Sequence, residues 1–368
     1  MSGHLRLLMT IDGVGGVWQY ATDLARALGR HNVETILALL GPLPPVEKRS
    51  AARAIPGVTL VETGLPLDWL ADAPDQVTLA GRRIAEMARH MRADLVQLNQ
   101  PALAAEVEFP VPVLVAAHSC LATWWEAVES GPLPDDFAWR VALHGEGLRT
   151  ATCVVTPSRA FAEATRSAYR LSELPTPVHN GRSPLLHPAA AMHDFAFTAG
   201  RLWDRAKNLA TLDRAAARLG VPVKAVGPLA GPHGERLQFA HLHTPGSMNE
   251  DALAGCLAAR PVFVSATKYE PFGLAVLEAA MAGCPLVLSD IPTFRELWRD
   301  AAIFVDADDD RGFADAIERL IGDMPQRLAR GEAARAVALA FTPARMAERM
   351  LDLYRPLVAS SHQDRVAA

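Results

Sequence analysis

The chain has 368 residues, half of them hydrophobic and 21% charged, with a formal net charge of −5 at pH 7. This length is long for one core and sufficient for two domains of about 150 to 200 residues each. The negative net charge gives no global affinity for nucleic acid, and the apolar runs are too short to span a bilayer. The four cysteines are scattered without a C-x-x-C pair, which argues against a zinc site and a disulfide framework. We therefore expect a soluble two-domain enzyme, with the cytosol as the simplest compartment.

The first half of the sequence alternates between predicted strands and predicted helices. His4 to Thr10 is an apolar strand, residues 11–16 form a glycine-rich turn, and residues 17–29 show helical periodicity. Because the start runs directly into this turn, we interpret it as a first strand and not as a signal peptide. Further strands are predicted at Val33 to Leu40, Val58 to Glu62, Asp94 to Leu98, Val111 to His118 and Cys153 to Pro157.

Gly15 and Gly16 lie between the first predicted strand and the first predicted helix. Glycines at such a turn let the backbone approach a phosphate at a helix N-terminus. The turn is weak evidence by itself, since any Rossmann-like domain can carry one. It is not a G-x-G-x-x-G turn, and no acidic residue closes the predicted second strand, so a dinucleotide site is disfavoured.

A predicted helix from Gln76 to Ala93 carries four arginines beside its apolar positions. Such a helix leaves open a contact with an anionic membrane surface. The positive cluster is interrupted by Glu86 and flanked by Asp94, which favours a solvated face instead.

His118 ends a predicted strand, and several tryptophans follow it. A histidine at the carboxyl end of a parallel strand is well placed for a ligand, although a local hydrogen bond is the alternative role. Trp124, Trp125 and Trp139 either line an acceptor groove or fasten a long connection onto the first domain, and we favour the connection.

The second half opens after an Asn-Gly turn at Asn180, with a linker placed at residues 181–193. A strand is predicted from Phe195 to Ala199 and a helix from Ala206 to Leu219. Arg201 follows the strand and Lys207 stands at the start of the helix. Because a lysine there is unfavourable for the helix dipole, a bound anion is the natural compensation. Arginine offers phosphate a planar fork and lysine a movable point charge.

Two carboxylates, Glu270 and Glu278, lie eight residues apart where a loop enters a predicted helix. The strand Pro261 to Ser265 precedes them, and Pro285 to Ser289 resembles the next parallel strand. The loop therefore lies at the carboxyl end of a sheet, where open α/β folds bind ligands. The amides of Phe272, Gly273 and Leu274 are expected to point outwards as unpaired donors of the helix N-terminus. Carboxylates accept hydrogen bonds from sugar hydroxyls, and the neighbouring amides attract an anion. This combination suits a sugar phosphate.

Histidines and aspartates elsewhere do not indicate a metal site. His241 and His243 alternate within Leu237 to Pro245 without a carboxylate or thiol at fixed spacing, so strand alternation is the simpler interpretation. Asp306 and Asp308 to Asp310 resemble a helix-capping turn.

These motifs together resemble glycosyltransferase family 4, the group 1 glycosyl transferases, which are retaining enzymes with the GT-B fold. The resemblance rests on the E-x7-E pair, the G-R-x5-K pair of Arg201 and Lys207, the glycine turn, Ala116-Ala117-His118-Ser119 and the Asn-Gly turn. It is strong from Ala199 to Val305 and looser before Val178. The stretches 102–148 and 241–249 depart from the family pattern, which affects the acceptor and the nucleotide base.

The resemblance implies an α/β structure of two Rossmann-like β/α/β domains facing a central cleft. The acceptor-side domain is expected at residues 1–180, with a C-terminal helix at 342–358 crossing back onto it, and the donor domain at 194–341. The implied catalytic residues are His118, Arg201, Lys207 and Glu270. Those implied for donor binding are Gly15, Gly16, Arg201, Lys207, Glu270, Phe272, Gly273, Leu274 and Glu278.

In this family the cation pair faces the donor pyrophosphate, and the glycine turn faces the distal phosphate and the acceptor. Glu270 and the following amides hold the sugar hydroxyls, Glu278 holds the ribose, and His118 lies near the transferred sugar. The implied activity is retaining transfer of a hexosyl group from a UDP-, GDP- or ADP-sugar to a hydroxyl acceptor, in cell-surface polysaccharide, glycolipid or related glycan synthesis. No metal or organic cofactor is expected, and the implied location is cytoplasmic, with peripheral contact at the inner membrane face left open.

Three other functions remain to be discriminated. A nucleotide-sugar epimerase of the same fold would need acid and base carboxylates around the sugar ring and no acceptor cleft. A phosphorylase-like enzyme would need a pyridoxal-binding lysine, and Lys268 lacks suitable surroundings. A non-catalytic nucleotide-sugar-binding protein is a further alternative, but degenerate members of the family usually lose a charged ligand and all four are present here.

Overall fold

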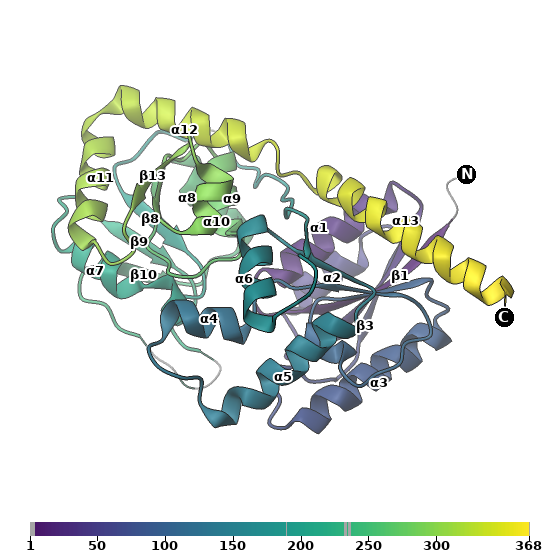
Figure 1. Cartoon of the computed structure of the whole chain (residues 1–368). Helices are drawn as coiled ribbons and strands as arrows, with labels where there is room; N and C mark the ends of the chain where they lie inside the picture. Colours follow the sequence, from purple (N-terminus) through teal and green to yellow (C-terminus); the bar gives the residue numbers. More distant parts are fainter. Residues whose placement is uncertain (1–3, 189, 232–233, 235–236, 368) are drawn as a thin grey trace. The chain divides into compact units, whose positions relative to one another are not determined.

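The chain divides into two compact units in a computed structural model (Figure 1). One unit comprises residues 1–181 and 342–368, and the other comprises residues 182–341. The structure describes residues 4–188, 190–231, 234 and 237–367, with no account of side chains beyond residue 361. Both units are α/β with all-parallel sheets, which confirms the predicted fold class. Within the described residues, no helix has the length and apolar character needed to cross a membrane.

The first unit is built on a seven-stranded sheet of order β3-β2-β1-β4-β5-β6-β7. Every strand pair is parallel, so all strands end at the same edge. The order reverses between β1 and β4, and such a reversal opens a crevice at the carboxyl edge. The strands are β1 (Leu5–Asp12), β2 (Val33–Leu40), β3 (Val58–Glu62), β4 (Leu95–Leu98), β5 (Val113–Ala116), β6 (Cys153–Thr156) and β7 (Thr176–Pro177).

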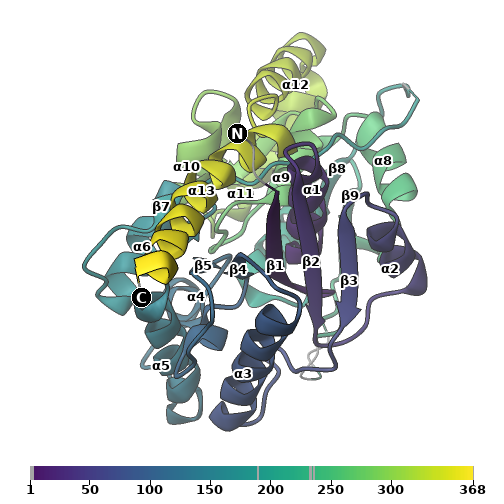
Figure 2. The same cartoon turned by 90° about the vertical axis from the view of Figure 1, so that its right-hand side faces the viewer.

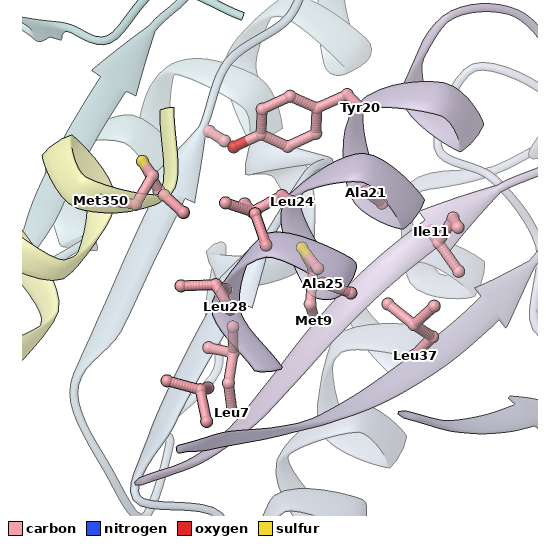
Figure 3. Close-up of a cluster of buried hydrophobic side chains, with 14 of the residues drawn as sticks. Leu7, Met9, Ile11, Tyr20, Ala21, Leu24, Ala25, Leu28, Leu37 and Met350 are labelled. Atoms are coloured by element: carbon pink, nitrogen blue, oxygen red, sulfur yellow. The ribbon is translucent and has the colours of Figure 1, made fainter. Parts of the chain in front are cut away.

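Helices connect these strands, and the C-terminal helix packs on the same unit. Figure 2 shows β1, β2 and β3 side by side with α1 against them. Apolar side chains of α1, including Leu24 and Leu28, lie between those of the strands and Met350 of α13 (Figure 3). The helices are α1 (Val17–Gly29), α2 (Val46–Arg53), α3 (Pro74–His90), η1 (Pro101–Ala104), α4 (Leu121–Val128), α5 (Asp135–Thr150), α6 (Arg159–Tyr169) and α13 (Pro343–Ala367).

The second unit has a six-stranded parallel sheet of order β10-β9-β8-β11-β12-β13, which reverses between β8 and β11. Its strands are β8 (Ala196–Ala199), β9 (Val223–Val226), β10 (His243–Gly246), β11 (Val262–Ser265), β12 (Leu286–Ser289) and β13 (Ala302–Val305). Its helices are η2 (Arg205–Lys207), α7 (Leu209–Ala216), α8 (Glu250–Ala258), α9 (Leu274–Met281), α10 (Pro292–Trp298), α11 (Asp310–Gly322) and α12 (Met324–Ala338). His243 begins β10 and His241 lies two residues before it, and both are exposed around buried Leu242.

The structure corrects two element boundaries. The strand predicted at Val111 to His118 is limited to β5, because Pro112 lacks an N–H and the chain leaves the sheet before His118. The helix predicted from Ala206 is broken in two. Asn208 adopts a left-handed conformation, with φ of 51°, and separates the 3₁₀ turn η2 from α7. Lys207 therefore ends a 3₁₀ turn and does not begin an α-helix.

A buried histidine in the first unit links stability to pH. His144 is 7% exposed, and its ring stacks on Tyr169 at a centroid distance of 5.1 Å. Its Nε2 is buried with no hydrogen-bond partner among the described residues. Burial lowers the pKa of His144 from 6.5 to about 4, since the interior disfavours the charged imidazolium.

We predict that His144→Phe reduces the loss of unfolding free energy that wild type shows as the pH falls. The folded pKa lies below the unfolded one, so the unfolded state binds more protons and wild type loses stability as pH falls from about 6.5 to about 4. The contribution of this histidine is at most about 3 kcal/mol at 1.36 kcal/mol per pKa unit. Urea unfolding at pH 7 and pH 4.5 measures it, and an unchanged difference between the two pH values in His144→Phe would contradict the assignment.

Candidate active site

A lysine–carboxylate pair lies at the strand-order reversal of the second unit. Lys207 follows β8, Glu270 follows β11, and Lys207 Nζ donates to Glu270 Oε2 at 2.6 Å. Both side chains are about one-fifth exposed, so each remains accessible from solvent. The structure thus places together, at one edge of the sheet, two residues that are 63 positions apart in the sequence.

A buried threonine holds the two loops that carry this pair. Thr267 Oγ1 lies 2.7 Å from the Ala206 carbonyl and 2.9 Å from the Tyr269 carbonyl, so its single proton is shared between the loop of Lys207 and the loop of Glu270. The amide of Lys268 donates to the same Ala206 carbonyl at 2.8 Å. Ser289 Oγ at the end of β12 donates to the Thr267 carbonyl. The pair is therefore fixed by backbone contacts as well as by its own ion pair.

Arg201, the second predicted cation, lies in the same loop as Lys207 but has its own partner. Its Nη2 donates to Asp204 Oδ2 at 3.0 Å, and its guanidinium lies over the Trp203 ring at 5.6 Å. Asp204 also caps the 3₁₀ turn by accepting from the Ala206 amide at 3.0 Å. Arg201 is 40% exposed, so its guanidinium can reach an anion without leaving a buried position.

The two helices whose N-termini were predicted to bind an anion, α1 and α9, each begin after a glycine N-cap that provides no side-chain cap. Gly16 is the N-cap of α1 after Gly15, whose φ is +94°, and Gly273 is the N-cap of α9 with φ of +95°. In contrast, the N-cap side chains of α6, α8, α11 and α12 accept backbone hydrogen bonds. A helix start that no side chain caps keeps its N–H donors for other acceptors.

Phe272 lies one residue before the N-cap of α9. Its buried ring packs edge-to-face on Phe341 at 5.7 Å. Gly273 and Leu274 are the N-cap and the first residue of α9, so their amides belong to the helix start. Gly273 permits the left-handed turn, and a Cβ at this position would crowd the Phe294 ring at 3.2 Å.

Glu278, one turn into α9, forms an ion pair with Arg182, which the sequence reasoning assigned only to the linker. Arg182 Nε donates to Glu278 Oε1 at 2.7 Å, and its Nη2 donates to Glu250 Oε1 at 2.9 Å. The side chains of Arg182 and Glu278 are 9% and 12% exposed. An arginine directly after the Asn-Gly turn is the only sequence signal that pointed to it.

In the first unit, His118 joins a buried polar network. Asn99 follows β4, donates through Nδ2 to the Thr10 carbonyl, and presents Oδ1 to His118 Nε2 at 3.0 Å. Gln97 Nε2 donates to the same oxygen at 3.0 Å and lies 3.1 Å from the Tyr20 hydroxyl. Tyr354 of α13 donates to Gln97. The network therefore runs from the C-terminal helix to the histidine.

This network selects a protonation state for His118. Asn99 Oδ1 can only accept, so the imidazole carries its proton on Nε2. Burial lowers the pKa of His118 to about 4, and its ring packs edge-to-face on Tyr20 at 4.4 Å. At neutral pH the ring is therefore uncharged, with Nδ1 as the acceptor. The Tyr20 amide donates to the Gly16 carbonyl at 3.0 Å, so the first turn of α1 connects the glycine turn with the residue that packs on His118.

Two family models match the chain. The model described as Glycosyltransferase Family 4 matches residues 14–184, and the model described as Glycosyl transferases group 1 matches residues 234–337. The chain belongs to the family 4, group 1 glycosyltransferases. The first match covers most of the unit with the glycine turn and His118, and the second contains Glu270 and Glu278.

Solved structures show that this glycosyltransferase family member has the GT-B fold. Sucrose-phosphate synthase from Thermosynechococcus elongatus aligns with a TM-score of 0.78 and 20% identity, covering 97% of this chain and 100% of that chain. HepE of Anabaena, in complex with UDP-glucose, aligns with a TM-score of 0.71 and 18% identity, covering 96% and 100%.

A curated relative matches a shorter segment. Alpha-maltose-1-phosphate synthase of Mycobacterium tuberculosis is 34% identical over 112 residues. The match spans 28% of this chain and 29% of that enzyme, so this glycosyltransferase shares less than a third of the relative's length in that comparison.

Proposed function

We propose that this chain is a retaining glycosyltransferase that transfers a hexosyl group from a nucleoside-diphosphate sugar to a hydroxyl acceptor. The observation that carries the proposal is the Lys207–Glu270 pair at the strand-order reversal of the second unit. The pair lies beside the start of α9, which no side chain caps, and the Arg201 guanidinium belongs to the same loop as Lys207. A diphosphate is bound by cations and N–H donors, and the hydroxyls of a sugar are bound by a carboxylate that accepts their hydrogen bonds.

The cations would stabilise charge on the leaving group. As the bond between sugar and β-phosphate breaks, negative charge grows on the phosphate, and preorganised donors aimed at that charge supply the largest catalytic term. An ammonium has three protons, so Lys207 can bond Glu270 with one and phosphate oxygens with the others. Glu270 thereby orients the lysine and offers its remaining acceptor capacity to sugar hydroxyls. No metal is required for this role.

His118 would position the sugar, because its Nε2 proton is directed at Asn99 and its imidazole is neutral at pH 7. In front-face attack the leaving phosphate accepts the proton of the acceptor hydroxyl, so the reaction needs no separate strong base. Among the candidate donors we favour UDP-glucose, which is the ligand of the HepE structure. We assign the acceptor to glycans or glycolipids of the cell surface, and the four free cysteines favour a reducing compartment such as the cytoplasm.

The proposal is tested by incubating the protein with UDP-, GDP- and ADP-sugars and measuring thermal stabilisation and nucleotide release. A transferase should be stabilised by one nucleotide family and release that nucleotide as glycoside forms. Conversion of the sugar without release of nucleotide would instead indicate an epimerase. Stabilisation without either reaction, across a panel of acceptors, would indicate a binding protein.

Lys207→Ala should lower kcat/KM by about 10²- to 10³-fold, the loss typical of removing one donor to developing transition-state charge. Lys268→Ala is the matched control, because Lys268 pairs with the exposed Asp308 at 2.8 Å and belongs to the surface. The control should remain within about threefold of wild type. Steady-state kinetics with the preferred donor decide between them, and similar rates for the two variants would remove Lys207 from the site.

The product formed from an α-linked donor should keep the α configuration. Arg201 and Lys207 would bind the diphosphate on the leaving-group side of the sugar. Front-face attack on that same side retains the anomeric configuration. Proton NMR of the first product, recorded before mutarotation, reads the configuration directly. A β-linked product would overturn the retaining assignment while leaving donor binding intact.

A further inference from the structure

Arg182 carries a buried charge and lies where the first and last residues of the second unit meet. It is the first residue of that unit, and its amide donates to the carbonyl of Phe341, the last residue, at 3.1 Å. Its guanidinium is 9% exposed and contacts Glu278 through Nε and Glu250 through Nη2. A buried arginine needs a compensating anion, since an unpaired buried charge is costly.

The two carboxylates are unequal partners. Glu278 is 12% exposed, whereas Glu250 in the first turn of α8 is 65% exposed and can be screened by water. The shorter contact, 2.7 Å, is also the one to Glu278. Arg182 therefore fixes the direction of the Glu278 carboxylate far more than that of Glu250, because charge-assisted bonds from a planar guanidinium are directional.

Glu278 lies about one helical turn beyond the start of α9. It follows Leu274 by four residues, which is about 6 Å along the helix axis at 1.5 Å per residue. A diphosphate at the N-terminus of α9 would place its ribose roughly one turn along the helix. The Glu278 carboxylate would then meet the ribose hydroxyls, provided that its rotamer is held.

We propose that Arg182 is a positioning residue for the nucleoside, holding the ionised Glu278 carboxylate in the orientation that accepts from both ribose hydroxyls. The inference rests on the proposed function, because it requires a nucleotide at this site. A positioning role of Arg182 differs from a purely structural role in one respect. A structural arginine supports the unit whatever the ligand, whereas a positioning arginine matters only when ribose hydroxyls are present.

The test is calorimetry of two ligands, UDP and its 2′,3′-dideoxy analogue, with wild type, Arg182→Gln, Arg182→Lys and Glu278→Gln. Arg182→Gln should weaken UDP by about tenfold or more, the effect of losing a hydrogen bond to a charged group, and leave the dideoxy analogue unchanged. Arg182→Lys, which keeps the charge without the fork, should fall between wild type and Arg182→Gln. Glu278→Gln should show the same dependence on the hydroxyls.

The matched control is Arg327→Lys. Arg327 is also buried in the second unit, and its hydrogen-bond acceptors among the described residues are Asp194, His193 and Arg260, none of them a predicted site residue. Its replacement should change thermal stability but leave the ratio of the two affinities at the wild-type value. If Arg182→Gln weakens both ligands equally, or neither, the positioning role is wrong while the proposed function stands. If wild type binds none of UDP, GDP and ADP, the proposed function fails and this inference fails with it.

Discussion

The site depends on one constraint of the fold, the side-by-side pairing of β8 and β11 in a parallel sheet. Parallel strands end at the same edge, and the strand order reverses between these two, which is where open α/β sheets bind ligands. The loop after β8 carries Lys207 and the loop after β11 carries Glu270. The threonine between them bonds both loops, which holds the ion pair at 2.6 Å without help from a ligand.

Charge balance explains why the cations of the site are paired. Lys207 is held by Glu270 and Arg201 by Asp204, so neither cation depends on a ligand for compensation. Arg201 is 40% exposed and Lys207 is one-fifth exposed, so both cations can be reached from solvent although Asp204 is buried. In the proposed function, a diphosphate would accept from the remaining N–H donors of both cations. Preorganisation of this kind keeps the reorganisation cost of binding low.

Sequence patterns predicted what is local and missed what is long-range. The strands Val33–Leu40 and Val58–Glu62 and the helix Val17–Gly29 have their predicted bounds, because hydrophobic periodicity and glycine turns record them directly. The break at Asn208 was missed, since propensity alone continues a helix through an asparagine. Arg182 was recognised as part of the linker but not as the partner of Glu278, because a contact across 96 residues has no trace in spacing.

The Lys207–Glu270 pair is the centre of this account, and Glu270→Gln tests it most directly. A glutamine at position 270 keeps an oxygen that accepts from Lys207 Nζ, so the variant should bind the free nucleoside diphosphate as wild type does. If the Glu270 carboxylate accepts from the sugar hydroxyls, the variant should bind the intact nucleotide sugar more weakly by about 1–3 kcal/mol. Isothermal calorimetry with UDP and UDP-glucose, or with whichever nucleotide the panel selects, measures both affinities. Equal losses for the two ligands, or no loss for the nucleotide sugar, would contradict the assignment of this pair to the transferred sugar.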